Sequence, residues 1–168
     1  TGYDFAGWYD GETLIPNSGN WNVDYNATLV AVWTPIQYEI TYDLHDGVNN
    51  EDNPDIYTIE DEITLLDPSK AGYTFVEWQD ELGSSVTKIE KGSMGDTSLE
   101  AIFSANLNTI TLTTEDSSKG TVSVTKGEGY TDEEITIKCT LANEVAFKGW
   151  YDGDTLVSNK STYTFNMP

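Results

Sequence analysis

The 168-residue sequence is poor in cysteine, histidine and basic residues. It contains one cysteine, one histidine, and 8 Lys and Arg against 29 Asp and Glu, which gives a formal net charge of −21 at pH 7. The single cysteine, Cys139, excludes an intramolecular disulfide framework and a cysteine-rich zinc site. The negative charge opposes the approach of a phosphate backbone or an anionic membrane surface, so we expect neither nucleic acid nor membrane insertion.

Long apolar runs and nucleotide-binding motifs are also missing. No stretch approaches the roughly 20 apolar residues that a membrane-spanning helix needs. The sequence shows no signal peptide, but it starts in the middle of a pattern, so we expect this to say nothing about secretion. It has no P-loop and no dinucleotide fingerprint, and we expect no cofactor. Its hydrophobic content of 38% and aromatic content of 12% are sufficient for packed cores, which predicts a folded protein.

A repeat organises the sequence. The pattern Gly-Tyr-x-Phe-x-x-Trp occurs at residues 2–8 and, 70 residues later, at 72–78. The pattern Leu-x-Ala-x-aromatic follows the same spacing, and a looser copy of the first signature lies at 147–153. Such self-similarity predicts tandem modules. We expect the C-terminal part of one module in 1–35, a complete module in 36–105, and a divergent module lacking its last strand in 106–168.

Hydrophobic residues alternate with polar ones within these modules. The alternation is clear at 38–44, 99–103 and 135–141, and it is typical of strands with one buried face. Turn sequences such as Asp46-Gly47 separate the strands. The sequence predicts a mostly β protein with antiparallel sheets and at most one short helix in each module, at 62–71 or 86–92. In this interpretation Cys139 is a small core residue.

The repeated aromatic residues have a structural and a functional interpretation. Alternation places Tyr3 and Phe5 on one face, and with Trp8 they would form the core of a small module, followed by a tight turn at Asp10-Gly11. The copy at 78–81 lacks the turn glycine and is predicted to turn differently. Alternatively, exposed rings could stack on sugars, and the candidates for such a platform are Tyr9, Trp21 and Tyr151.

The complete module resembles the Listeria–Bacteroides repeat, also called the InlB B-repeat. The segments "YEITYDLHDG", "PSKAGYTFVEW" and "TSLEAIF" carry the likeness, and "KGTVSVTKGEGYTDEEITIKCTLANEVAFKGWYDG" resembles the divergent form of the repeat. Glu77 replaces the usual glycine before Trp78. The resemblance implies β-grasp-like modules in tandem on secreted or wall-attached bacterial surface proteins, without catalytic residues.

Candidate chemistry is sparse. His45 is the only histidine, and no nucleophile motif accompanies it, so catalysis is disfavoured. Oxygen-bearing side chains crowd the segment 43–55, which offers calcium candidates in Asp43, Asp46, Asp52 and Asp55. Their spacing does not match the calcium-loop pattern, so the favoured interpretation is a solvated turn and no metal site.

Three classes of function remain. The favoured one is a non-catalytic stalk or spacer on the bacterial cell surface that also contacts proteins, in adhesion for example. The second is carbohydrate binding through the candidate rings, and the third is an enzyme fragment. Residues 1–35 lack partner strands for their aromatic side chains, so we expect apolar surface there and pairing of Leu29–Trp33 with a strand edge of a second copy.

Overall fold

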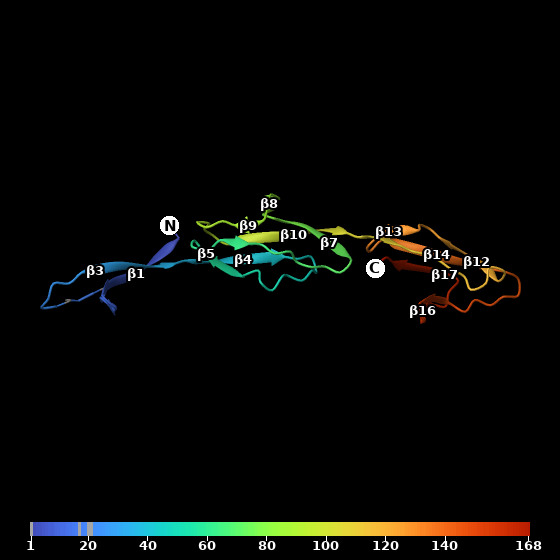
Figure 1. Ribbon diagram of the computed structural model, residues 1–168, viewed down its shortest axis with the longest axis horizontal. Helices are drawn as coiled ribbons and strands as arrows, with labels where there is room; N and C mark the ends of the chain where they lie inside the picture. Colours follow the sequence, from blue (N-terminus) through green and yellow to red (C-terminus); the bar gives the residue numbers. More distant parts are fainter. Residues whose placement is uncertain (1, 17, 20–21) are drawn as a thin grey trace. The chain divides into compact units, whose positions relative to one another are not determined.

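The computed structural model describes residues 2–16, 18–19 and 22–168, and within them the chain forms strands and loops without a helix (Figure 1). This confirms the mostly β fold predicted from alternation. Contacts divide the chain into two compact units. The first comprises Thr1–Ser69 and Phe75–Ile102, and the second comprises Lys70–Thr74 and Phe103–Pro168.

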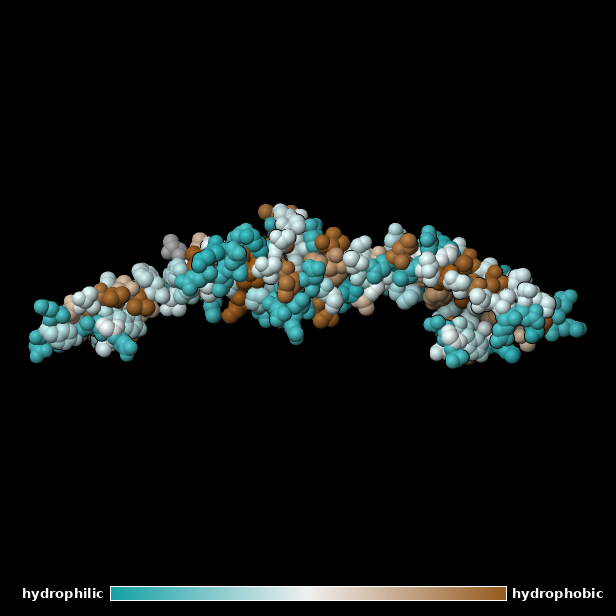
Figure 2. All heavy atoms as spheres, viewed as in Figure 1, coloured by the Kyte–Doolittle hydropathy of each residue, from teal (hydrophilic) through white to brown (hydrophobic). Residues whose placement is uncertain are grey.

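The first unit begins with a three-stranded antiparallel sheet. Its strands are β1 (Tyr3–Asp10), β2 (Thr13–Leu14) and β3 (Leu29–Pro35), in the order β2-β1-β3. A bulge between Phe5 and Gly7 interrupts the pairing of β1 with β3. Apolar side chains lie at the surface over β1 and β3 (Figure 2), as expected for residues 1–35.

A five-stranded sheet follows, in the order β5-β4-β10-β7-β8. Its strands are β4 (Gln37–Asp43), β5 (Ile56–Thr58), β7 (Tyr73–Gln79), β8 (Ser85–Val86) and β10 (Thr97–Ala105). The pairing of β4 with β10 is parallel, which the antiparallel expectation did not include. Parallel neighbours need a long crossover, and residues 44–96 supply it.

The two segments considered for helices form strands. β6 (Ile63–Thr64) pairs in antiparallel fashion with β9 (Lys88–Ile89), beside the five-stranded sheet. Leu65 and Ile89 are buried there. Their packing in the core favours strands over the short helices that the local sequence allowed. The buried apolar residues of this module are Ile40, Tyr57, Leu65, Trp78, Ile89, Leu99 and Ala101.

The second unit has three small antiparallel sheets. One pairs β11 (Leu107–Thr109) with β13 (Glu128–Tyr130), and another has the order β12-β14-β17. The remaining strands are β12 (Gly120–Val124), β14 (Glu134–Leu141), β17 (Thr162–Asn166), and the hairpin of β15 (Trp150–Asp152) and β16 (Thr155–Ser158). Ile135, Ile137, Trp150 and Met167 form the core, and Cys139 packs against it as predicted.

The Phe and Trp of the repeated signature contact each other in every copy. The ring centroids are 5.8 Å apart for Phe5 and Trp8, 5.5 Å for Phe75 and Trp78, and 5.6 Å for Phe147 and Trp150. Trp78 and Trp150 are 2% and 8% exposed, whereas Trp8 is 48% exposed. The core interpretation of these rings therefore holds for the second and third copies, and the first copy presents the same pair at the surface.

Candidate functional site

The parallel pairing of β4 with β10 ends at an acidic groove of the first unit. The register of β4 and β10 sets Asp43 opposite Glu100. The groove is lined by these two residues and by Asp80 and Glu81, which follow β7. Four carboxylates in one groove create a negative potential that favours cations and basic side chains.

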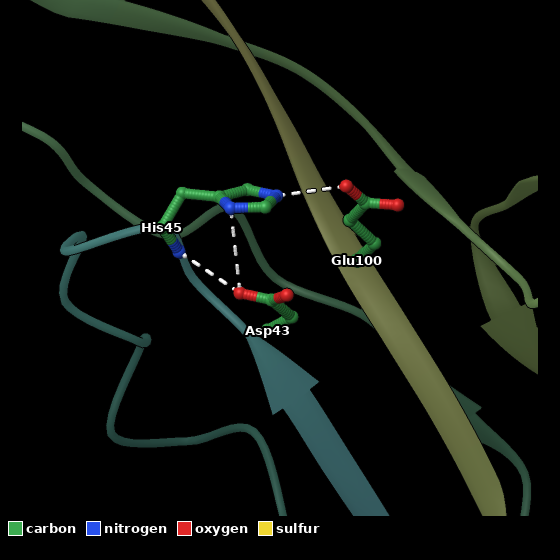
Figure 3. A network of polar contacts seen from close by, with 3 residues as sticks. All are labelled: Asp43, His45 and Glu100. Atoms are coloured by element: carbon green, nitrogen blue, oxygen red, sulfur yellow. Dashed lines mark hydrogen bonds and ion pairs between the residues drawn. The ribbon is translucent and has the colours of Figure 1, made fainter.

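His45 bridges the two opposed carboxylates (Figure 3). Its Nε2 lies 2.8 Å from Glu100 Oε1, its Nδ1 lies 3.5 Å from Asp43 Oδ1, and its backbone N–H donates to the same Asp43 oxygen at 3.2 Å. Like charges directly opposite each other destabilise a sheet, and a ring between them reduces that repulsion. His45 and Asp43 could be singled out separately from the sequence, but Glu100 could not, because it lies on a strand 55 residues further along the chain than His45.

His45 owes its position to an unusual turn. His45 and Asp46 have φ values of 46° and 67°, and the N–H of Gly47 donates to the carbonyl of Leu44 at 2.7 Å. Left-handed backbone at two successive residues reverses the chain directly after β4 and folds the imidazole back toward Asp43. The site holds an imidazole, carboxylates and the hydroxyls of Thr41 and Ser98, which hydrogen-bond to each other at 3.0 Å.

The Asn- and Asp-rich segment is bound by its own side chains. Asn49 and Asn50 accept hydrogen bonds from backbone N–H groups one and two residues ahead. Asn53 is only 7% exposed, and its side-chain nitrogen donates to Asn49 Oδ1 at 2.8 Å and to the Leu66 carbonyl at 2.9 Å. Asn49, Asn53 and Leu66 thus form a hydrogen-bonded structural clasp that fixes the loop. The expectation of a solvated turn did not include it.

The calcium candidates Asp43, Asp46, Asp52 and Asp55 do not gather. Among the residues that the structure describes, no group of three or more His, Cys, Asp or Glu is arranged to hold a metal ion. Asp43 faces His45 instead. Burial, with a smaller contribution from the charge of Asp55, raises the pKa of Tyr42 to about 12, and the Tyr42 hydroxyl donates to the Pro54 carbonyl at 2.8 Å. Calcium binding thus stays a hypothesis from sequence.

Tyr9 and Tyr151 occupy the same position in two equivalent hairpins. Tyr9 is paired with Leu14, and Tyr151 with Leu156. In both hairpins a Cβ built on the preceding glycine, Gly7 or Gly149, would overlap the leucine Cδ1. The tyrosines therefore belong to a packed hairpin. Tyr9 is half-buried, whereas Tyr151 is 55% exposed.

Trp21 lies outside the described residues. After β7 the chain turns differently from the Asp-Gly hairpins, as predicted: Asp80 Oδ1 accepts the backbone N–H groups of Leu82 and Ser84, and Gly83 has a φ of 75°. The two described candidate rings belong to different units, Tyr9 to the first and Tyr151 to the second.

Family models match two segments that together cover most of the chain. Residues 38–102 match the Listeria-Bacteroides repeat domain, and residues 110–168 match the divergent InlB B-repeat domain. The chain belongs to the InlB B-repeat families. The matched segments of this InlB B-repeat chain contain the acidic groove and the Tyr151 hairpin, respectively. Both families are non-catalytic repeat domains typical of bacterial surface proteins.

One relative of this InlB B-repeat chain is described as "Putative membrane protein" and comes from Evansella cellulosilytica. It is 30% identical over 98 residues, which is 54% of this chain and 15% of that protein. The InlB B-repeat chain therefore spans a small part of that relative's length. No solved structure matches. None of the described residues belongs to a helix long and apolar enough to cross a membrane.

Proposed function

We propose that this chain is a non-catalytic, extracellular stalk segment of a bacterial surface protein, which spaces other domains and contacts proteins in adhesion. The observation that carries the proposal is the repetition of one β module in families typical of surface proteins. Each copy keeps its own Phe–Trp contact, so each module has its own local packing. Modules that pack locally can be added in series, which suits a spacer.

Two surfaces support a role in protein contacts. The acidic groove with Asp43, Asp80, Glu81 and Glu100 is complementary to basic segments of a partner. β3 lies at the edge of its sheet, and Val30 and Trp33 on it are 55% and 57% exposed. An exposed apolar edge strand can pair with a strand from another chain. We further propose that Leu29–Trp33 pairs with a strand edge of a second copy of this chain.

Solution scattering tests the spacer role. The full chain is expected to behave as an elongated particle, and adding a further copy of residues 36–105 is expected to increase its maximum dimension in proportion. A compact particle whose maximum dimension does not grow with the added module would contradict the proposal. Attachment to the cell surface is tested separately, by labelling intact cells that express the parent protein.

Sedimentation over a range of concentrations tests the edge pairing. Val30→Lys places a charge on the exposed edge strand and is expected to abolish self-association. Val76→Lys is the matched control, because Val76 is 57% exposed but lies on β7, which has neighbours on both sides. If both variants associate like the unchanged protein, or the unchanged protein is monomeric at every concentration, edge pairing is wrong.

Carbohydrate binding is the second candidate, and the exposure of Tyr151 is the observation that favours it. A flat ring that is 55% exposed next to Asp152 and Asp154 offers one stacking face and polar neighbours. A glycan array with the full chain and with Tyr151→Ala is the test. Binding that disappears in the variant would support the candidate, and an array without hits would remove it.

A further inference from the structure

The Gly-Tyr pair that opens the repeated signature makes a contact outside its own strand. In the first unit, the Tyr3 hydroxyl donates to Glu60 Oε1 at 2.9 Å. The carbonyl of Gly2 accepts the N–H of Ile36 at 3.0 Å, and a Cβ on Gly2 would lie 2.5 Å from Ile59 Cδ1. Gly2 and Tyr3 therefore dock on the loop that follows β5.

The second unit repeats this contact with different residues. The Tyr73 hydroxyl donates to Asp132 Oδ2 at 2.7 Å, and the carbonyl of Gly72 accepts the N–H of Asn106 at 3.0 Å. A Cβ on Gly72 would lie 2.6 Å from Thr131 Cγ2. Residues 70–74 belong to the second unit, so this contact is internal to it.

The two receiving loops are equivalent in register. Gln37 pairs with Thr58 in β4–β5, and Leu107 pairs with Tyr130 in β11–β13. The contacted residues are in both cases the first two after these strand positions. The same turn follows in each loop. The N–H of Asp61 donates to the carbonyl of Thr58, and the N–H of Glu133 donates to the carbonyl of Tyr130.

Glycine is required at the contact for two reasons. Gly2 and Gly72 have φ values of 76° and 77°, in the left-handed region that disfavours other residues. Each also lies so close to the receiving loop that a side chain would clash with it. The tyrosine that follows adds a charge-assisted hydrogen bond to an acidic residue, Glu60 or Asp132. The receiving side is therefore a short acidic turn that presents Ile or Thr to the glycine.

We propose that the Gly-Tyr pair is a docking element through which each repeat binds the post-strand acidic turn of the repeat that follows it, and that this contact couples their stabilities. The third copy carries Glu144-Val145 at the corresponding positions. Glu144 keeps the left-handed conformation, with a φ of 63°, but a valine has no hydroxyl to donate. This copy receives a contact and offers none of the same kind. The inference goes beyond the proposed stalk function and does not depend on it.

Glycine substitutions in the full chain test the coupling. Gly72→Ala introduces both backbone strain and the clash with Thr131, whereas Gly83→Ala introduces the strain alone. Gly83 has nearly the same φ, 75°, and a Cβ there would meet only Gln79 Oε1 at 3.9 Å. The readout is hydrogen exchange of the backbone amides in β13 and β14, residues 128–130 and 134–141. Gly72→Ala is expected to accelerate this exchange by at least about 10-fold, and Gly83→Ala is expected to leave it unchanged.

The tyrosine gives a milder test that keeps the backbone intact. Tyr73→Phe removes only the hydroxyl, and it is expected to accelerate exchange in β13 about 3- to 10-fold, as the loss of one hydrogen bond does. Tyr151→Phe is the control. Asp132→Asn tests the same bond from the other side, and the double variant is expected to add little to either single one. If Gly72→Ala and Tyr73→Phe change exchange only in β7 and leave residues 128–141 unchanged, the proposal is overturned.

Discussion

The side chain of Asn53 forms two hydrogen bonds with the backbone of Leu66, one in each direction. Asn53 Nδ2 donates to the Leu66 carbonyl at 2.9 Å, and the Leu66 N–H donates to Asn53 Oδ1 at 2.8 Å. The indole N–H of Trp78 donates to the same carbonyl at 3.1 Å. Through these two bonds the Asn53 amide pairs with the Leu66 backbone as a neighbouring strand would. The core tryptophan and the Asn-rich loop thus share one acceptor.

Replacing Asn53 by alanine is expected to destabilise the first unit by about 2–3 kcal/mol, because it removes three hydrogen bonds of a buried side chain, two with the Leu66 backbone and one with Asn49. Thermal denaturation followed by circular dichroism measures the loss. Asn26→Ala is the control, since Asn26 is exposed. An Asn53→Ala midpoint equal to that of the control would contradict the clasp.

The two buried tryptophans are expected to respond differently to phenylalanine. Trp78→Phe removes a hydrogen bond to Leu66, whereas the indole nitrogen of Trp150 is buried and has no hydrogen-bond partner among the described residues. We expect Trp78→Phe to cost about 1 kcal/mol more than Trp150→Phe, because an unpartnered buried N–H already carries a desolvation cost that phenylalanine removes. Chemical denaturation of the two variants makes the comparison, and an equal cost would argue against it.

Removing the imidazole of His45 is expected to lower the melting temperature by a few degrees at low salt, because Asp43 and Glu100 then face each other across the parallel pair. Salt screens such repulsion, so the loss is expected to shrink at about 1 M salt. The second variant, His45→Ala with Glu100→Gln, is expected to recover the loss. A deficit that is the same at both salt concentrations would show that His45 acts through packing alone.

The hydroxyl of Tyr73 is expected to lose its proton at a higher pH than an ordinary tyrosine. The hydrogen bond from its hydroxyl to Asp132, followed by burial and the charge of Asp132, raises the pKa of Tyr73. A raised pKa in the folded state stabilises the protonated form, so the stabilisation is complete below the ordinary tyrosine pKa of about 10 and is lost as pH rises through the higher value. Nuclear magnetic resonance of the tyrosine ring carbons measures the titration. Asp132→Asn is expected to move it down toward the ordinary value, and an unchanged titration would contradict the assignment.

Calcium is expected to leave the melting temperature unchanged, because the described residues bring no three acidic side chains together in a metal-holding group. Melting curves with calcium and with a chelator make the comparison. A rise in the midpoint that the chelator reverses would revive the candidate site at Asp43, Asp46, Asp52 and Asp55, and the matching asparagine variants would then identify the ligands.

The strands could be predicted from the sequence because their signal is local. Alternation at 38–44 and 135–141 marks one buried face, and β4 and β14 occupy these segments. The parallel pair of β4 and β10 could not be predicted in this way, because it joins residues 57 positions apart, as in Thr97 with Ile40. The short strands β6 and β9 were mistaken for possible helices because two residues of strand leave almost no periodic signal.

The candidate site was predicted in part. Repetition identified the Phe and Trp of the signature as core residues, and their ring contacts recur in each copy. The same argument placed Tyr3 in the core, but it did not predict that the hydroxyl of this half-buried residue contacts Glu60. Alternation assigns a side chain to a face of its own strand, but it contains no information about a loop from the next module. Glu100 and the structural role of Asn53 were missed because their partners, His45 and Leu66, lie 55 and 13 residues away in the sequence.

The contact made by the Gly-Tyr pair has a direction. One side of it lies at the head of a strand in one repeat, and the other lies in a turn of the next repeat, so the two surfaces are different and the contact joins head to tail. An array built on such a contact can gain or lose whole repeats by duplication or deletion of about 70 residues, and every new junction is formed from surfaces that already exist. Its length can therefore change genetically in steps without the invention of a new interface.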